Sequence, residues 1–352
     1  MALNDKQLEI VHTKEPKCVV IAAAAAGKTA TMVERVRYLL DSGVPTGDIV
    51  VITFTNLAAN EMQERLGRPE GIFIGTTHSY ANYLLLSSGI DTGKVLESEK
   101  FDKLFHMVTD NPHCVKKVKY LIVDEAQDCN DLQFEFFEMI NPENFMYIGD
   151  LRQSIYMFAG ATPDNLRAIS KQEDVTVFDL NQNYRNDISI LDFAKTIISP
   201  ILIDTSIAMS RSRGFVRTVD LTADELIRQI ELRPEYKSWF VLCRTNAEVE
   251  WADEVLKKAE IPCDIIRRAD FDTKQELEEK LAAETVKVMT IHSSKGLEND
   301  YVFAIGMKYF NEEERCISYV AATRAKHFLV LAKKPYAKRP AYQKKFQTKS
   351  WE

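Results

Sequence analysis

Short apolar runs alternate with longer segments of helical periodicity along almost the whole chain. In the first half, the apolar runs predict buried strands at 18–22, 49–53, 72–74, 120–123 and 145–148. The segments that follow most of these runs predict helices at 29–40, 56–66, 77–86 and 131–140. Strands that are apolar on both faces and separated by helices are typical of a parallel sheet covered by helices.

The second half repeats this α/β pattern. Its apolar runs predict strands at 175–180, 215–219, 239–243, 263–266, 286–290, 301–305 and 328–331. Helices are expected at 187–198, 223–230, 247–259 and 312–325. A polar stretch at 170–173, after a short helix at 165–169, marks the expected boundary. We therefore expect an N-terminal domain at 1–172, a C-terminal domain at 173–335 and a loosely ordered tail at 336–352.

Composition narrows the class of protein. The 352 residues are 45% hydrophobic and 28% charged, as in soluble globular proteins. No apolar stretch reaches the roughly 18–20 residues that span a bilayer, and the first residues lack the layout of a signal peptide. Six scattered cysteines without a Cys-x-x-Cys pair are typical of reduced thiols, so we expect a cytoplasmic protein with no membrane partner. A net charge of −7 disfavours coating of nucleic acid by bulk charge, but a local basic groove remains possible.

Residues 18–29 form an apolar run that breaks at Gly27-Lys28-Thr29 and continues into a helical pattern. This is the order of a strand, a phosphate-binding loop and a helix N-terminus, where backbone N–H groups and the helix dipole attract phosphate. Lys28 is expected to reach the β- and γ-phosphates, and the Thr29 hydroxyl to ligate Mg²⁺. Five alanines, 22–26, stand where such loops are glycine-rich, so a plain strand-to-helix turn is the alternative for this segment alone.

The apolar run 120–123 ends in a cluster of acids that begins at Asp124 and Glu125 and ends at Asp128. A carboxylate at the carboxyl end of a parallel strand, beside a phosphate loop, can hold Mg²⁺ and orient water. We expect Asp124 to bind the ion and Glu125 to act as general base on the hydrolytic water. The alternative is a strand followed by a solvated acidic turn.

Eight segments together resemble, in order, the motifs of superfamily 1A helicases of the UvrD/Rep/PcrA type. Beyond the phosphate loop and the acid cluster, the matching segments are 3–7, 52–62, 75–79, 148–158, 180–185, 241–246, 288–298 and 319–325. Each match is weak by itself, whereas an ordered set from residue 3 to residue 325 is specific. The resemblance implies two RecA-like P-loop NTPase domains, each a parallel sheet flanked by helices.

The resemblance also implies a site for ATP and Mg²⁺ between the two domains. The residues that it assigns to nucleotide binding are Gln7, Ala24, Ala25, Ala26, Gly27, Lys28, Thr29, Tyr184 and Glu298. Among these, Gln7 would read the adenine edge, Tyr184 would stack on the base and Glu298 would take a ribose hydroxyl. The catalytic set is Lys28, Glu125, Gln153, Arg185 and Arg324, with Thr29 and Asp124 as metal ligands. Gln153 would sense the γ-phosphate or position water, while the two arginines would neutralise charge on the transferred phosphoryl group.

The family binds a single DNA strand by aromatic stacking and small polar contacts, which tolerate any sequence. By position, the implied DNA-binding residues are Phe54, Thr55, Asn56, Thr76, His78, Tyr156, Phe158, His292 and Lys295. The alternative for the aromatic residues among them is a place in the core, and for His292 a structural role.

The chain departs from the family pattern at several points. Ala23 and Ala25 replace inner glycines of the phosphate loop, which would weaken phosphate binding if either position needs φ > 0. Ala30 and Ala159 stand where the family usually has arginines, and Phe158 replaces a common tryptophan. The family's two large insertions are reduced here to 80–119 and 265–285, too short for domains.

These observations predict a bare two-domain motor: a DNA-dependent ATPase and helicase that moves 3′ to 5′ on single-stranded DNA. Its expected partners are single strands and single-strand/duplex junctions, with a protein partner as a possible source of grip on duplex. Two alternatives remain open at this stage. One is a regulatory module with a weak or degenerate ATP site, and the other is a motor subunit of a larger nuclease or replication complex. A bacterial, viral or mobile-element source would suit the small size.

Overall fold

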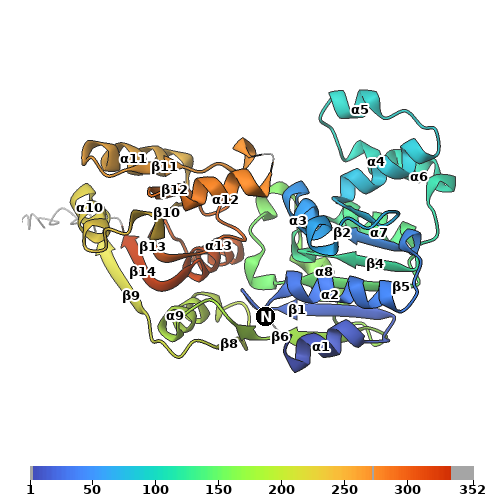
Figure 1. The fold of residues 1–352 in the computed structure, drawn as a ribbon, viewed down its shortest axis with the longest axis horizontal. Helices are drawn as coiled ribbons and strands as arrows, with labels where there is room; N and C mark the ends of the chain where they lie inside the picture. Colours follow the sequence, from blue (N-terminus) through green and yellow to red (C-terminus); the bar gives the residue numbers. More distant parts are fainter. Residues whose placement is uncertain (1–2, 272, 334–352) are drawn as a thin grey trace, which may run out of the picture.

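Two six-stranded sheets with parallel strand pairs form the two halves of the computed structural model, which describes residues 3–271 and 273–333 (Figure 1). The first sheet has the order β3-β2-β4-β5-β1-β6, and the second has the order β11-β12-β10-β13-β14-β9. A short pair, β7-β8, lies between them in sequence. The predicted α/β class, with two parallel sheets flanked by helices, is confirmed. The expected tail at 336–352 lies outside the described residues.

The first sheet is built from the apolar runs of residues 17–180. Its strands are β1 (Lys17–Ala22), β2 (Ile49–Ile52), β3 (Phe73–Gly75), β4 (Tyr120–Val123), β5 (Asn144–Gly149) and β6 (Thr176–Leu180). Its helices are α1 (Asp5–His12), α2 (Lys28–Asp41), α3 (Asn56–Leu66), α4 (Thr77–Ser87), α5 (Gly93–Glu97), α6 (Lys103–Asp110), α7 (Asp131–Ile140) and α8 (Pro163–Ile169). Alternate residues of β1 enter different cores: Val19 packs in the cluster that contains Phe137, whereas Val20 packs in the cluster that contains Met32. The central strands are largely apolar, since helices cover both faces of the sheet, whereas the edge strand β6 carries Thr176 and Asp179.

The expected boundary between residues 172 and 173 is wrong by one strand. β6 pairs in parallel with β1, with Cys18 opposite Thr176 and Ala22 opposite Leu180. The polar stretch at 170–173 is therefore the turn between α8 and the edge strand of the first sheet, and the chain leaves that sheet only after Leu180. Polar composition marks exposed backbone, which a turn inside a domain shares with a linker.

The second sheet carries the remaining strands and helices. Its strands are β9 (Phe215–Asp220), β10 (Trp239–Cys243), β11 (Cys263–Ile265), β12 (Val286–Thr290), β13 (Asn299–Ile305) and β14 (Ala325–Lys333). The other elements of this half are β7 (Gln182–Asn183), β8 (Ile207–Ala208), α9 (Ile188–Ile198), α10 (Ala223–Glu231), α11 (Asn246–Lys258), α12 (Lys274–Ala282) and α13 (Glu312–Thr323). One of its two cores also contains Ala24 and Ile155 from the first half, buried with Tyr319 of α13. The two halves therefore share apolar contacts along α13.

In their described residues, the two short segments expected in place of large insertions consist of helices and the turns that connect them, after the last residue of β11. Residues 80–119 form the rest of α4, then α5 and α6, and residues 265–285 contain α12. α12 reaches back to the first half, where Lys274 Nζ lies 3.0 Å from Glu61 Oε1 of α3. All six cysteines are free, and five of them are buried. No helix in the described part of the chain has the length and apolar character needed to cross a membrane.

Candidate functional site

The phosphate loop connects β1 to the first residue of α2, Lys28. Two of its residues have left-handed backbone: Ala25 at φ 54° and Gly27 at φ 79°. Glycine adopts this region freely, whereas an L-residue with a Cβ pays about 1–2 kcal/mol there. Of the two alanines that replace family glycines, Ala25 is therefore strained and Ala23 has no left-handed backbone.

Side chains and backbone from distant segments bind the carbonyls of this loop. The Ala26 carbonyl accepts a hydrogen bond from Gln7 Nε2 at 2.9 Å. The Ala24 carbonyl accepts one from Asn183 Nδ2 at 3.0 Å, and Tyr184 N donates to the Ala25 carbonyl at 3.3 Å.

The backbone N–H groups of the phosphate loop, unlike its carbonyls, are largely without hydrogen-bond partners in the described residues. Within residues 3–271 and 273–333, the backbone N–H groups of Ala24, Ala25 and Gly27 have no hydrogen-bond acceptor. A loop whose carbonyls are held from outside and whose amides are free, at a helix N-terminus, is suited to bind an anion.

The acid cluster follows β4 and faces this loop. Lys28 Nζ lies 3.3 Å from Glu125 Oε1. The Glu125 backbone is left-handed, with φ 51°, and Gln127 Nε2 donates to its Oε2 at 2.6 Å. Burial alone would raise the pKa of Glu125, but Lys28, Lys295 and the Gln127 amide together lower it. Glu125 is thus held as a carboxylate.

Asp124 is buried beside it and has the opposite shift. Burial, together with the Glu125 charge, raises the pKa of Asp124 to about 6. A bound cation would stabilise the ionised form of Asp124, which burial and the Glu125 charge disfavour. Asp124 and the Thr29 hydroxyl offer the oxygen ligands that Mg²⁺ prefers, so these two predicted ligands fit the ion that the family implies.

The Lys295 side chain, 10% exposed, lies between the acid cluster and the rings of Phe54 and Tyr156, whose centroids are 5.9 and 5.4 Å from its Nζ. Its Nζ forms an ion pair with the buried Asp128 carboxylate, lies 3.5 Å from Glu125 Oε2 and donates to the Gln153 carbonyl at 3.1 Å. Burial lowers the pKa of Lys295, but Asp128 and Glu125 raise it overall. A lysine of the second half therefore enters the acid cluster of the first half.

Gln153 and Arg324 meet across the interface between the halves. Arg324, which is 1% exposed, donates from Nη2 to Gln153 Oε1 at 3.2 Å. Its other donors bind the Val320 and Leu297 carbonyls, both at 3.0 Å, and no carboxylate in the described chain pairs with it. Burial and the neighbouring Arg185 lower the pKa of Arg324 to about 9. An arginine buried without a counter-charge is poised to receive an anion.

Arg185 and Glu298, to which the resemblance assigns separate roles, form an ion pair with each other. Arg185 Nε donates to Glu298 Oε2 at 2.5 Å, and Lys326 Nζ lies 3.3 Å from the other oxygen. Arg185 also donates to the Thr323 carbonyl at 3.1 Å, next to Arg324. In this arrangement the Glu298 carboxylate is paired with two cations of its own half. A ribose hydroxyl would have to bind the same oxygens beside Arg185 and Lys326.

Tyr184 lies beside the start of the N-terminal helix α1. It is 43% exposed, and its hydroxyl accepts a hydrogen bond from Asn4 Nδ2 at 2.8 Å. Gln7 lies in the first turn of α1, the helix that Asn4 caps, and donates a hydrogen bond to the Ala26 carbonyl of the phosphate loop. The structure thus brings the two predicted adenine contacts to the same side of the phosphate loop.

Aromatic side chains from both halves gather in one cluster. Phe54, after β2, lies 4.8 Å between ring centroids from Tyr156, and Tyr156 lies 6.3 Å from Phe158. His292, after β12, lies 5.3 Å from Phe158 and 5.9 Å from Tyr156. Phe158 is 69% exposed and Phe54 37%, so neither is a core residue.

A cavity of about 430 Å³ opens beside this cluster. It is lined by Phe158, Arg244, Thr245, Asn246, Thr290 and His292. The His292 ring donates to the Ile155 carbonyl at 3.1 Å, and burial lowers the pKa of His292. The His292 ring is thus neutral and tied to the opposite half through Ile155.

Of the four other predicted DNA contacts, Thr55, Thr76 and His78 have local structural partners. Thr55 and Thr76 accept the hydrogen bonds that cap α3 and α4, from Ala58 N and Ser79 N, both at 3.2 Å. Asn56 is exposed as the first residue of α3. His78 forms a 2.9 Å contact with Asp102 and packs 4.8 Å from the Phe105 ring, so it belongs to the α4–α6 segment and not to the aromatic cluster.

Several residues of the site were not singled out from the sequence. Gln127, which is fully buried, donates to Glu125 and accepts from Asp150 N at 2.9 Å. Asp150 and Arg152 form a buried ion pair beside Gln153. Both Gln127 and Asp150 lie inside the motifs identified above, and their polar character at the ends of buried strands was the available signal.

Comparison with known proteins agrees with the motif order. The AAA domain family matches residues 7–159, and the UvrD-like helicase C-terminal domain family matches residues 272–335. The ATP-dependent DNA helicase Rep of Escherichia coli is 25% identical over 80% of this chain and 58% of its own length. The Rep helicase of Buchnera aphidicola from Schizaphis graminum is 23% identical over 80% of the chain and 59% of its own length. The ATP-dependent DNA helicase PcrA of Leuconostoc citreum is 25% identical over 78% and 51%.

The chain thus spans little more than half the length of the curated relatives that it matches. Among solved structures, the PRRSV helicase aligns with a TM-score of 0.49 and 15% identity, over 95% of this chain and 55% of that one. The two family matches flank the interface at which the acid cluster, Gln153 and Arg324 meet. Together with the full order of motifs, they show that the chain is similar to UvrD/Rep/PcrA-type helicases in both of its halves.

Proposed function

We propose that this chain is an ATP-driven motor that moves along single-stranded DNA, with helicase activity at junctions with duplex. The observation that carries the proposal is the contact between Arg324 Nη2 and Gln153 Oε1, 3.2 Å apart and on opposite halves. A buried arginine without a counter-charge, aimed at the acid cluster across an interface, couples the state of the nucleotide to the distance between the halves.

The phosphates of ATP would bind to the free backbone amides of the phosphate loop and to Lys28. Mg²⁺, held by Thr29 and Asp124, would neutralise charge on the β- and γ-phosphates. Glu125 is already a carboxylate and would accept the proton of the attacking water. Gln153 would hold that water in line, and Arg324 would stabilise the negative charge that develops on the transferred group.

Closure of the two halves follows from the same charges. The lowered pKa of Arg324 reflects its burial and the nearby Arg185, and a phosphate would supply the missing counter-charge. Lys295 already reaches from the second half into the acids of the first. Release of phosphate would remove the attraction and let the halves separate.

The aromatic cluster is the proposed track for DNA. Rings from both halves contribute to it, so a change in the distance between the halves moves one side of the track against the other. Stacking on a base is worth about 1–3 kcal/mol and is independent of sequence. Movement from 3′ to 5′ is proposed from the family.

We propose that unwinding is weaker than translocation. Opening one base-pair step costs about 1.4 kcal/mol, which ATP hydrolysis easily supplies. The two insertion points, however, hold only α4–α6 and α12. Little of this chain remains to grip duplex, and a protein partner that binds the junction would add that grip.

The test measures ATP turnover with single-stranded DNA, with duplex DNA and without DNA, for the native chain, Arg324→Ala and Arg324→Lys. We expect strong stimulation by single strands and a fall in kcat of about 10³-fold or more in both variants, since a point charge does not replace the planar fork. Arg315→Lys, on the same helix but bonded to the Ile197 carbonyl, is the control. A native chain that hydrolyses ATP equally with and without DNA would contradict the proposed motor and support the regulatory alternative.

A further inference from the structure

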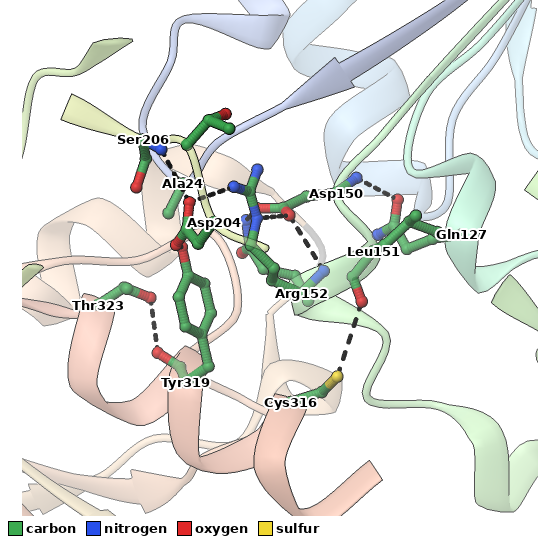
Figure 2. Close-up of polar contacts among 12 residues, drawn as sticks. Ala24, Gln127, Asp150, Leu151, Arg152, Asp204, Ser206, Cys316, Tyr319 and Thr323 are labelled. Carbon is green, nitrogen blue, oxygen red and sulfur yellow. Dashed lines mark hydrogen bonds and ion pairs between the residues drawn. The ribbon is translucent and has the colours of Figure 1, made fainter. Parts of the chain in front are cut away.

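Arg152 lies inside the interface between the halves, with its guanidinium between two carboxylates (Figure 2). Its Nε donates to Asp150 Oδ1 at 2.6 Å, and its Nη1 donates to Asp204 Oδ1 at 2.5 Å. The residue is 5% exposed, and neither carboxylate side chain exceeds 1%. Its Nη2 has no hydrogen-bond partner among the described residues.

Asp204 belongs to the second half of the chain, between α9 and β8, and is tied to α13. The Tyr319 hydroxyl of α13 donates to Asp204 Oδ2 at 3.1 Å, and Ser206 N donates to Oδ1 at 2.9 Å. Figure 2 shows the Tyr319 ring directed at Asp204 from below the guanidinium. The position of Asp204 therefore follows the position of α13.

Asp150 belongs to the first half and orients Gln153. Its Oδ1 accepts from the backbone N–H of Arg152 as well as from Nε, and its Oδ2 accepts from Gln153 Nε2 at 2.6 Å. With its amide nitrogen bound there, Gln153 presents its oxygen to Arg324. A continuous chain of polar contacts thus runs from Asp204 through Arg152, Asp150 and Gln153 to Arg324.

Stability alone does not explain this chain of charges. Burying an ion pair costs several kcal/mol of desolvation per ion, and a packed apolar contact of the same volume is often as stable or more so. What a buried Arg–carboxylate fork provides is a defined geometry. Burial raises the pKa of Asp204, but Arg152 and the Ser206 contacts lower it overall, so the carboxylate is ionised at neutral pH.

We propose that Arg152 and Asp204 are positioning residues for ATP hydrolysis, which act through Asp150 to set the orientation of the Gln153 amide according to the placement of α13. This inference rests on the proposed function, because it assigns Gln153 to the hydrolytic water or the γ-phosphate. Neither Arg152 nor Asp204 touches the nucleotide in this scheme. Their effect falls on the rate of hydrolysis and on its dependence on closure, not on ground-state ATP binding.

The test compares Asp204→Asn, Arg152→Lys, Arg152→Met and the double variant Arg152→Met/Asp204→Asn. Asp204→Asn keeps the shape of the site and gives a folded variant if loss of Arg152 proves too disruptive. The control is Arg167→Met, since Arg167 of α8 also pairs across the interface, with Glu312 of α13, but does not contact Asp150 or Gln153. Melting temperature, kcat and KM for ATP are measured for each, together with affinity for ADP and for ADP with aluminium fluoride, which mimics the transferred phosphoryl group.

We expect kcat to fall about 10- to 100-fold in the Arg152 variants and in Asp204→Asn, as for partners that orient a primary catalytic group, with KM nearly unchanged. Affinity for ADP with aluminium fluoride should fall by the same factor, whereas affinity for ADP alone should not. The double variant should lose no more than Arg152→Met, because both changes break one contact. Arg167→Met should keep both quantities within about threefold, as for a partly exposed pair.

Equal losses in Arg167→Met, or a folded Asp204→Asn with native kcat and native affinity for the aluminium fluoride complex, would overturn the inference. Strictly additive losses in the double variant would also overturn it, because they would show that Arg152 does not act through Asp204. A native chain that binds no nucleotide would instead refute the proposed function, and the inference with it.

Discussion

Lys28 Nζ lies 3.3 Å from Glu125 Oε1, so the lysine of the phosphate loop and the proposed general base neutralise each other. The pair is held between a second cation, Lys295, and the Gln127 amide. When phosphates draw Lys28 toward them, Glu125 keeps Lys295 and Gln127 as partners and stays ionised. Binding and base activation are therefore linked at one carboxylate.

From this relationship we expect Glu125→Gln to bind ATP with nearly native affinity and to turn over about 10²–10⁴-fold more slowly. Lys28→Ala should lose most ATP binding, since it removes the cation at the first residue of α2, directly after the loop amides. Nucleotide titration and steady-state turnover with single-stranded DNA separate the two effects. Glu143→Gln, on an exposed pair with Lys117, is the control. Undiminished turnover in Glu125→Gln would exclude Glu125 as the base.

The strained alanine of the phosphate loop gives a second prediction. Ala25→Gly should raise the free energy of unfolding by up to about 1 kcal/mol, because it relieves a left-handed Cβ, and should tighten nucleotide binding. Ala23→Gly is the matched control: its backbone is not left-handed and its side chain is fully buried. That variant should lose about 0.5–1 kcal/mol through backbone entropy and packing. Urea unfolding with and without ATP measures both, and equal shifts in the two variants would show that strain at Ala25 is not the cause.

Phe158 and Phe215 provide a matched pair for the DNA track, because each is 69% exposed but only Phe158 belongs to the aromatic cluster. We expect Phe158→Ala to weaken binding of a single strand by about 1–3 kcal/mol, the value of one stacked base. Phe215→Ala, on the edge strand β9, should leave it unchanged. Fluorescence anisotropy with a labelled oligonucleotide gives both affinities. Native affinity in Phe158→Ala would remove this ring from the track.

Lys287 predicts a specific dependence of stability on pH. It is fully buried on β12, where Nζ donates to the Ala283 and Thr285 carbonyls, and burial lowers its pKa from 10.5 to about 8. Between pH 8 and 10.5 the unfolded chain holds this proton and the folded chain does not, so stability should rise with pH through this window.

Below pH 8 the folded chain also carries the proton, and the cost of the buried charge is then fully present. Lys287→Met lacks this titration, so native stability should gain on the order of 1–3 kcal/mol relative to the variant between pH 7.5 and 10. Urea unfolding at several pH values measures the difference. Lys258→Met, on an exposed pair with Glu254 that does not act on Lys287, is the control. A difference that does not change with pH would show that Lys287 is not the titrating group.

The amino-acid sequence by itself determined the elements and the positions of the motifs. β4, β10, β12, α3 and α7 have the predicted bounds, and most other predicted elements differ by one or two residues, whereas no range was predicted for α1, α5, α6, α12, β7 and β8. Buried parallel strands read as continuous apolar runs, and helices begin at local caps such as Thr55 and Asn130, so both signals lie within a few residues of the element that they define. The order of motifs similarly required no knowledge of contacts.

Only the tertiary structure decided which sheet β6 joins and which carboxylates form ion pairs with Lys295 and Arg152. The partners of Lys295 in the acid cluster lie up to 170 residues away in sequence, and Arg152 and Asp204 are 52 residues apart. A lysine in a helicase motif is equally compatible with a DNA phosphate and a buried carboxylate, because residue type sets the charge but the path of the backbone sets what that charge meets. The same reason separates Ala25 from Ala23: the two residues are chemically identical, and only the turn of the loop makes one of them strained.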